Sequence, residues 1–257
     1  MIYSFGMIDD KRFKNKKMKL ILLLFFLLQF SFNGICQDEP LIPEYIPTEG
    51  LVGWWPFNAN ADDESGNGNF GTVNRAKLCE DRFEKKSKAY QFDGIYSYIT
   101  VELHNQSLLL DNNFTISFWT KLNFNNNNDQ TFISKGDGFS NEYSIFCSQE
   151  YEIEFIDHGK MLQPNFKFQG FNSWTNIVCT MDHGIGSIYI DGSLVYNITT
   201  AKVILPSNLP LVFGATFEPG TNTPIRNSYL NGKLDDVGIC NRVLTKDEIL
   251  KLANADF

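Results

Sequence analysis

Residues 174–195 read Trp-Thr-Asn-Ile-Val-Cys-Thr-Met-Asp-His-Gly-Ile-Gly-Ser-Ile-Tyr-Ile-Asp-Gly-Ser-Leu-Val, and two turn signals divide this stretch into three short segments. Asp191-Gly192 predicts a two-residue β-hairpin, because a type I′ turn needs φ > 0 at both central positions. Asp182-His183-Gly184 supplies the other reversal of the chain. Apolar and polar residues alternate over residues 187–190, which is the period of a strand with one buried face. The stretch therefore predicts an antiparallel meander at the centre of an all-β domain.

Short apolar segments on both sides of the meander predict further strands. They cover residues 51–57, 70–73, 89–92, 98–101, 114–122, 131–135, 142–147, 151–156, 166–168, 211–214 and 230–239. A single short helix is expected at the end of the chain, because Thr245-Lys-Asp-Glu248 has the pattern of a capping box. About a dozen strands at this spacing predict a jelly-roll β-sandwich of two antiparallel sheets with a short C-terminal helix.

Residues 1–36 have the order of a secretory signal peptide. Residues 14–19 are basic, residues 20–30 are apolar except for one Gln, and small residues follow before Gln37. We expect cleavage before Gln37; the alternative is a lipoprotein signal with Cys36 as the lipidated residue. Translation starts at Met1 or Met18. The apolar segment is shorter than the roughly 20 residues of a membrane span, so we expect a secreted or cell-surface protein without a transmembrane span in the mature chain.

The remaining chain divides into a Pro-rich linker over residues 37–49 and one domain over residues 50–257. Four cysteines remain after cleavage, namely Cys79, Cys147, Cys179 and Cys240. An even number in an exported protein permits disulfide bonds, and buried free thiols are the equal alternative.

The charge of the chain argues against nucleic acid as a partner. The formal net charge is -8, and six of the 22 basic side chains lie in residues 1–36 together with only two of the 30 acidic ones. Nucleic-acid affinity depends on Lys and Arg that neutralise phosphates, and this domain is strongly acidic. The composition is compatible with cations and with neutral ligands such as glycans.

Seven short motifs in order give the chain a resemblance to the LamG-like jelly-roll family, within the concanavalin A-like lectin/glucanase superfamily. They begin at Gly50 (GLVGWWPF), Asp63 (DESGNG), Ala89 (AYQFDG), Phe114 (FTISFW), Trp174 (WTNIV), Tyr189 (YIDG) and Asn231 (NGKLDDV). The resemblance covers residues 50–255, and Cys240 departs from it, since the family often has Tyr there. It implies a jelly-roll fold and extracellular binding, without naming a ligand.

The resemblance also implies a calcium ion between an early loop and the end of the last strand. Calcium takes six to eight oxygen ligands from carboxylates and carbonyls. Carried over to this chain, Asp63 and Asp236 become the expected ligands, and Asp236 is expected to point away from the core. The alternative is that Asp63 and Ser65 stabilise the turn through hydrogen bonds from backbone N–H groups to their side chains.

The acidic strand at residues 152–157 resembles the catalytic strand of glucanases in the same superfamily. Retaining hydrolysis needs two carboxyl groups roughly 5–5.5 Å apart, and Glu152 and Glu154 share one strand face. Asp157 has the opposite parity, and the family has Asp where this chain has Glu154. A half-buried strand with outward polar residues explains the stretch without catalysis, so hydrolysis is the alternative reading.

Aromatic side chains are the expected contacts for a sugar ring, and we predict Trp55, Trp174 and Tyr143 as ligand-binding residues. The sequence as a whole predicts a secreted, non-catalytic binding module for extracellular carbohydrate, assisted by calcium. A glycoside hydrolase of the same fold and an adhesion module that binds a surface protein are the alternatives.

Overall fold

The computed structural model describes residues 42–104, 106–123, 128–136, 142–157, 160–162, 167–199, 209–221 and 223–255. The predicted signal peptide, its cleavage site and residues 37–41 lie outside these residues. Residues 41–257 form one compact unit, and the fold described below is that of this unit.

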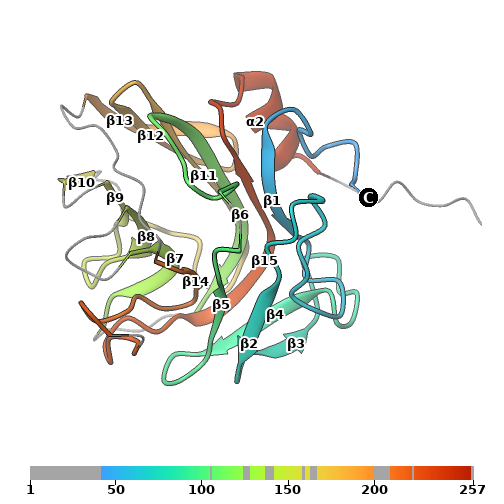
Figure 1. The fold of residues 1–257 in the computed structure, drawn as a ribbon, viewed down its shortest axis with the longest axis vertical. Coiled ribbons are helices and arrows are strands. Elements are labelled where there is room, and N and C mark those ends of the chain that lie inside the picture. The colour runs from blue at the N-terminus through green and yellow to red at the C-terminus, as the bar shows by residue number, and fades with distance from the viewer. Residues whose placement is uncertain are drawn as a thin grey trace, which may run out of the picture. The chain divides into compact units, whose positions relative to one another are not determined.

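Two antiparallel sheets face each other and form a β-sandwich (Figure 1). The first sheet has the order β13 (Ser193–Thr199), β12 (Ile185–Ile190), β11 (Trp174–Asp182), β6 (Asn113–Leu122), β15 (Asn231–Cys240), β4 (Ala89–Asp93), β3 (Lys77–Cys79), and β1 (Leu51–Trp55) also pairs with β15. The second has the order β10 (Lys160–Leu162), β9 (Ile153–Asp157), β8 (Tyr143–Cys147), β7 (Gln130–Lys135), β14 (Leu211–Phe213), β5 (Tyr98–Val101), β2 (Gly71–Asn74). The predicted fold class, a jelly-roll β-sandwich of two antiparallel sheets, is confirmed.

The central meander forms as the turn residues predicted. Strands β11 and β12 are joined by His183 and Gly184, with φ of 47° and 85°, and β12 and β13 by Asp191 and Gly192, with φ of 47° and 74°. Positive φ at both central positions is the requirement of the type I′ hairpin, whose twist matches that of the flanking strands.

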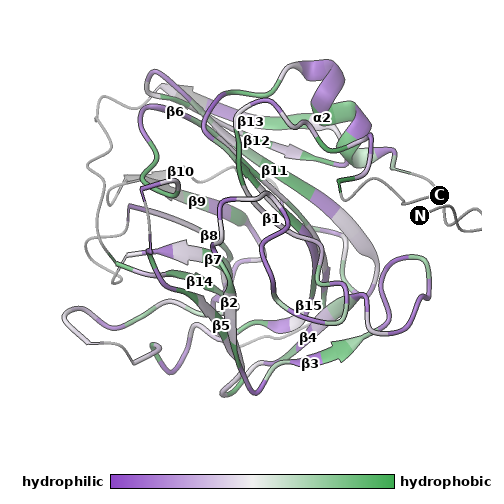
Figure 2. Ribbon diagram, turned by 45° about the vertical axis from the view of Figure 1, so that its right-hand side comes forward, coloured by the Kyte–Doolittle hydropathy of each residue, from purple (hydrophilic) through white to green (hydrophobic). Residues whose placement is uncertain are grey.

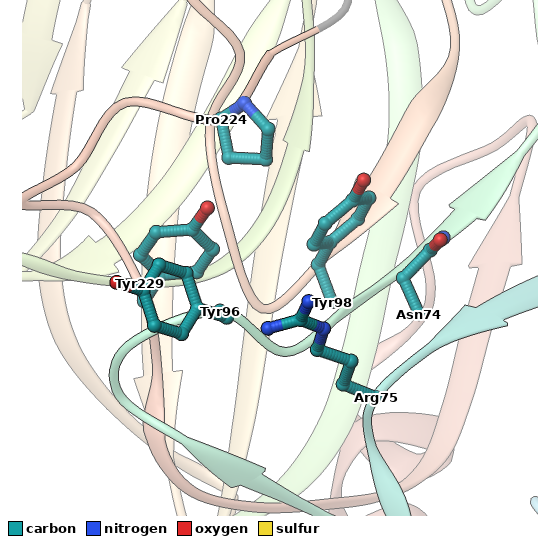
Figure 3. Close-up of a pocket in the computed structure, with 6 residues that line it drawn as sticks. All are labelled: Asn74, Arg75, Tyr96, Tyr98, Pro224 and Tyr229. Atoms are coloured by element: carbon teal, nitrogen blue, oxygen red, sulfur yellow. The ribbon is translucent and has the colours of Figure 1, made fainter.

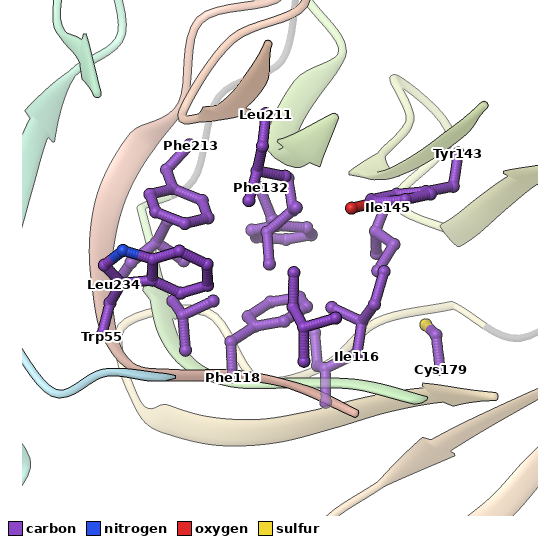
Figure 4. Packing of buried hydrophobic residues seen from close by; sticks show 14 of the residues in the cluster. Trp55, Ile116, Phe118, Phe132, Tyr143, Ile145, Cys179, Leu211, Phe213 and Leu234 are labelled. Carbon is purple, nitrogen blue, oxygen red and sulfur yellow. The ribbon is translucent and has the colours of Figure 1, made fainter. Parts of the chain in front are cut away.

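The core between the sheets is rich in aromatic side chains (Figure 4). The alternation in β6 places Phe114, Ile116 and Phe118 in the core with no exposed surface. Trp55 of β1 meets Phe213 of β14 edge to face, with ring centroids 5.0 Å apart, and so joins the two sheets. Burial of each large apolar side chain contributes about 1.5–3 kcal/mol, which makes these residues the main source of stability.

Helix α2 (Lys246–Ala253) covers the outer face of the first sheet and shows a hydrophobic and a hydrophilic side (Figure 2). The predicted capping box is present: Thr245 accepts a hydrogen bond from the backbone N–H of Glu248, and the Glu248 side chain accepts one from the backbone of Thr245. Ile249 and Leu252 bury against a second apolar cluster that contains Trp54 and Val178. Among the described residues, no helix is long and apolar enough to cross a membrane.

The described part of the predicted linker is packed against the domain, so the linker prediction is wrong for residues 42–49. Ile46 is 5% exposed and belongs to the apolar cluster beneath α2. The Glu49 carbonyl accepts a hydrogen bond of 2.8 Å from the Arg242 side chain. Proline-rich composition is therefore compatible here with an ordered strap whose apolar side chains are buried.

Three further expectations differ from the structure. Lys167 forms an isolated bridge with Glu152, and residues 167–168 form no strand. Strands β3 and β10 were not among the predicted strands. The four cysteines that the structure describes are free thiols, so of the two alternatives left open by the sequence the disulfide bonds are absent from it. Cys147 and Cys179 face the core, where burial raises the pKa of the Cys147 thiol to about 12.

A β-bulge interrupts the last strand at the position predicted to bind calcium. Asp235 is opposite Trp119 of β6 and Gly238 is opposite Ser117, so β15 has one residue more than its partner between these pairs. The extra residue is accommodated at Asp236, whose φ is 48°. Such a bulge bends the strand and changes the parity of the side chains beyond it.

Candidate functional site

A pocket of about 650 Å³ lies at one end of the second sheet and is a candidate ligand site (Figure 3). Ile99 and Val101 of β5 point into the core, so Tyr98 on the same strand lies on the opposite, outer face of the sheet. We call this site the tyrosine pocket, and it is lined by Asn74, Arg75, Tyr96, Tyr98, Pro224 and Tyr229.

The loop between β4 and β5 presents Tyr96 to the pocket, and Asp93 holds this loop in place. One carboxylate oxygen of Asp93 accepts hydrogen bonds from the backbone N–H groups of Ile95, Tyr96 and Ser97, at 2.9–3.0 Å. The Ser97 hydroxyl donates to the same oxygen at 2.8 Å. Partial burial raises the pKa of Asp93, but these donors favour the carboxylate and lower its pKa to about 2. The ring of Tyr96, which is 57% exposed, is thus fixed at the mouth of the pocket.

The segment after β14 folds over the outer face of the second sheet and supplies Tyr229. Val212, Ala215, Phe217 and Tyr229 form a small apolar cluster of their own, with Tyr98 packed against it. The rings of Tyr98 and Phe217 meet edge to face at a centroid distance of 5.8 Å. Ser228 joins the two arms of the segment, because its hydroxyl accepts a hydrogen bond from the Thr216 N–H at 3.0 Å. The floor of the tyrosine pocket is therefore packed before any ligand arrives.

Arg75 is the only charged residue among those that line the tyrosine pocket. It follows β2 with a φ of 62° and forms an isolated bridge with Tyr98. Its Cζ lies over the ring of Tyr96, 5.3 Å from the centroid, which is within the range of a cation–π interaction. Burial and then the neighbouring Tyr98 raise the pKa of Tyr229, and the positive charge of Arg75 opposes that rise.

Two of the three predicted ligand-binding residues are in the core, so those two predictions are wrong. Trp55 and Tyr143 have no exposed surface, and Figure 4 shows both rings among the core side chains. The indole N–H of Trp55 donates to the Asn69 carbonyl at 2.8 Å. Trp174 is partly exposed at the start of β11 and does not line the tyrosine pocket. Its role as a sugar contact stays a prediction.

The two predicted calcium ligands already have protein partners. Asp63 accepts hydrogen bonds from the N–H groups of Trp54, Ser65 and Asn69, each at 2.9 Å, which is the predicted alternative of turn stabilisation. Asp236 forms an ion pair of 2.6 Å with Arg82. Among the described residues, no group of three or more His, Cys, Asp or Glu side chains is arranged to hold a metal. These carboxylates do not fit calcium in this arrangement, because a cation would have to displace Arg82.

Arg82 holds two adjacent carboxylates on the outer face of the first sheet. It pairs with Asp235 at 3.1 Å and with Asp236 at 2.6 Å, and its guanidinium lies 4.8 Å from the centroid of Trp119. The Tyr45 hydroxyl donates to Asp236 at 2.9 Å. Burial, and then the charge of Asp236, raise the pKa of Asp235 well above its ordinary value, although Arg82 opposes the rise. Asp236 does point away from the core as predicted. Its side chain is only 10% exposed, because Arg82 and Tyr45 contact it.

The acidic strand does not form an open pair of carboxylates. Glu152 lies just before β9 and faces the Lys167 ammonium group at 3.6 Å. Glu154 is 3% exposed, on the face of β9 opposite the core residues Ile153 and Phe155. Neither glutamate lines the tyrosine pocket. Glu154 thus points away from the core, as expected for the outward polar residues of this strand, but other residues cover it.

The tyrosine pocket was not predicted from the sequence, although one local signal for it was present. Asp93-Gly94 is a turn signal between the predicted strands at residues 89–92 and 98–101. Two large side chains follow it, Ile95 and Tyr96, which are 56% and 57% exposed. Two adjacent large apolar residues in a turn that an aspartate fixes indicate a contact surface rather than a core segment.

Several solved protein domains share the fold of this chain. Domain 4 of AbnA, a GH43 extracellular arabinanase from Geobacillus stearothermophilus solved with arabinotriose, is 18% identical with a TM-score of 0.62; the match covers 79% of this chain and 98% of that domain. The binding domain of Paraclostridial Mosquitocidal Protein 1 is 21% identical with a TM-score of 0.65, over 81% of this chain and 52% of the other. The botulinum neurotoxin serotype D binding domain is 19% identical with a TM-score of 0.62, over 80% and 52%.

The chain thus spans about half of each toxin binding domain, and identities this low show a common fold alone. No curated protein is similar enough in sequence to count as a relative. The sequence profile described as the concanavalin A-like lectin/glucanases superfamily matches residues 93–250, which is more than half of the chain. The protein belongs to the concanavalin A-like lectin/glucanases superfamily.

Proposed function

We propose that this protein is a non-catalytic binding module for extracellular carbohydrate, and that the tyrosine pocket holds the ligand. The observation that carries the proposal is an aromatic side chain, Tyr96, that is 57% exposed beside the polar groups of Asn74, Arg75 and Tyr98. A sugar ring has an apolar C–H face and a rim of hydroxyl groups, so it needs an aromatic platform with hydrogen-bonding groups around it. The volume of about 650 Å³ lies within the range of ligand pockets and accommodates a short oligosaccharide.

The structural neighbours support a binding function without naming the ligand. One is a domain of an extracellular arabinanase that was solved with arabinotriose, and two others are toxin binding domains. Export is part of the proposal and rests on the signal-like order of residues 1–36. Intact mass of the secreted product tests it: we expect a chain that begins at Gln37, and a diacylated Cys36 would move the protein to a membrane surface.

A binding role is favoured over hydrolysis by the residues around the tyrosine pocket. Glycoside hydrolysis uses a pair of carboxyl groups that flank the scissile bond. The described residues that line the pocket include no Asp or Glu, and Asp93 below the loop is engaged by four donors. Glu152 and Glu154, the candidates of the alternative reading, lie on another part of the sheet.

A glycan array with the secreted chain tests the proposal. We expect binding to one class of saccharide and no release of reducing sugar from the polymers of that class. Turnover that is lost in Glu152→Gln would replace the proposal by a hydrolase. Binding to no saccharide, with capture of a cell-surface protein through a face that excludes Tyr96, would replace it by an adhesion module.

A further inference from the structure

We infer that the tyrosine pocket selects an acidic saccharide, and that Arg75 binds the carboxylate of a uronic acid unit. The inference rests on the proposed function and adds the charge of the ligand to it. Arg75 is the only charged residue among the described residues that line the pocket, and these include no acidic side chain.

Arg75 differs from the two other arginines that the domain uses in its own structure. Arg82 pairs with Asp235 and Asp236, and Arg242 pairs with Glu248 at 2.6 Å. Among the residues that the structure describes, no carboxylate lies within ion-pair distance of Arg75. Its guanidinium therefore retains its capacity for an acidic partner, and the pocket is where such a partner would reach it.

The position of the guanidinium suits a carboxylate. Cζ lies over the Tyr96 ring at 5.3 Å, so the aromatic face orients the cation. The N–H groups of a guanidinium project in its own plane, and a stacked arginine can still donate two parallel hydrogen bonds to one carboxylate. A uronic acid unit whose ring stacks in the pocket would combine aromatic contact and charge in one ligand.

The backbone at residue 75 fits a side chain that is kept for a purpose other than packing. Its φ of 62° lies in the left-handed region, which costs a residue with a side chain roughly 1–2 kcal/mol. Glycine would adopt this conformation without that cost, and the side chain of Arg75 is exposed rather than needed for the core. Nine other described residues with side chains also have a positive φ, so this conformation supports the binding role only together with the charge of Arg75 and its place in the pocket.

The negative net charge of the chain repels anions, so an acidic saccharide needs the positive charge of Arg75 in direct contact with it. The formal net charge of the chain is -8. Repulsion between exposed charges is largely screened beyond about 8 Å at physiological ionic strength, so a single cation in direct contact decides the preference of the pocket. Sulfate esters share this chemistry, and the experiment below separates them from carboxylates.

Calorimetric titration of the secreted chain with matched saccharides tests the inference. The probes are tetrasaccharides of galacturonate, glucuronate and alginate, their methyl esters, which keep the rings and remove the charge, and a sulfated tetrasaccharide. We expect at least one uronate to bind about tenfold more tightly than its ester, as for a hydrogen bond to a charged group. Arg75→Gln should abolish this preference, and Arg75→Lys should retain part of it. Arg226→Gln removes the same charge from an exposed residue that does not line the pocket, and it should change affinity less than twofold.

The outcomes separate this inference from the proposed function. Tight binding of a neutral saccharide that Tyr96→Ala abolishes and Arg75→Gln leaves unchanged would overturn the inference and retain the binding module. Tighter binding of the sulfated probe than of any uronate would also overturn it. If no saccharide binds, both fail. Arg75→Gly, which keeps the backbone conformation, serves as a second variant: it should melt no lower than wild type and still lose the preference for acid.

Discussion

The ring of Tyr96 meets the ring of Tyr229 edge to face, with centroids 6.3 Å apart, although one belongs to a turn between β4 and β5 and the other to the segment before β15. Tyr229 is almost fully buried and Tyr96 is mostly exposed. The buried ring of Tyr229 thus holds the exposed ring of Tyr96 in one position. Such preorganisation lowers the entropy cost of binding a ligand.

The loop that carries Tyr96 should loosen in acid. The pKa of Asp93 is lowered from 3.8 to about 2, so its stabilising effect is complete above about pH 4 and is lost as the pH falls through about 2. Melting temperatures measured between pH 5 and pH 2 should fall, and the fall should be smaller in Asp93→Asn, which cannot titrate. Equal pH profiles for the two proteins would contradict this account of the loop.

Removal of Arg82 should be strongly destabilising. Arg82→Met leaves Asp235 and Asp236 as buried carboxylates without their cation, and loss of one partner of a buried ion pair costs about 3–5 kcal/mol. Urea unfolding measures the change in the free energy of unfolding. Arg226→Met, at an exposed position, is the matched control and should stay within about 0.5 kcal/mol of wild type. A similar small loss in both variants would show that the buried cluster contributes little.

The hairpin turn at Gly192 should be sensitive to a methyl group. A Cβ at Gly192 would lie 2.9 Å from Leu250 Cδ2 and 3.2 Å from Ala253 Cβ of helix α2, and its φ is 74°. Gly66 has a φ of 91° and open space around its Cα, so Gly66→Ala reports the backbone cost alone, about 1–2 kcal/mol. Gly192→Ala should cost more than this, by up to about 1 kcal/mol, because the Leu250 side chain must turn away and Ala253 of α2 must move slightly. Equal losses in chemical denaturation would mean that α2 does not pack tightly on the hairpin.

Asp63 should stabilise the fold with or without calcium. Asp63→Asn places an amide where three backbone N–H groups donate, and we expect a loss of about 1–3 kcal/mol. Asp62→Asn is the control, because Asp62 is exposed and contacts Asn60. Melting curves with millimolar calcium and with chelator should coincide for all three proteins. A rise in melting temperature with calcium in wild type that is missing from Asp63→Asn would restore the predicted metal site.

Local chemistry in the sequence was sufficient to predict much of the fold. Asp191-Gly192 specifies its turn because both residues tolerate positive φ, and Thr245 with Glu248 specifies the start of α2 through mutual hydrogen bonds. The alternation of apolar residues in β6 matches the buried positions Phe114, Ile116 and Phe118. These signals act over a few residues, so one sequence is enough to read them.

The site predictions that the structure contradicts were wrong for two physical reasons. Counting parity along β15 gave the direction of Asp236 correctly, but it could not show that Arg82 and Tyr45, which are far away in the sequence, cover its carboxylate. Trp55 and Tyr143 show the second cause: strand alternation tells which residues share a face, but only the packing of the two sheets decides that this face is covered. The tyrosine pocket could not be predicted from the sequence for a related reason. Tyr96 and Tyr229 meet only once the segment after β14 folds over the sheet.

The central claim, that the tyrosine pocket is the ligand site, is tested most directly by calorimetric titration of the best saccharide from the array into Tyr96→Ala and Ile95→Ala. Both side chains are more than half exposed on the same turn, and Tyr96 alone lines the pocket, so the two variants differ mainly in loss of the platform. The account predicts that Tyr96→Ala weakens binding at least about tenfold, as expected for a central aromatic contact, while Ile95→Ala changes it less than twofold. Equal affinity of Tyr96→Ala and wild type, with unchanged melting temperature, would contradict it.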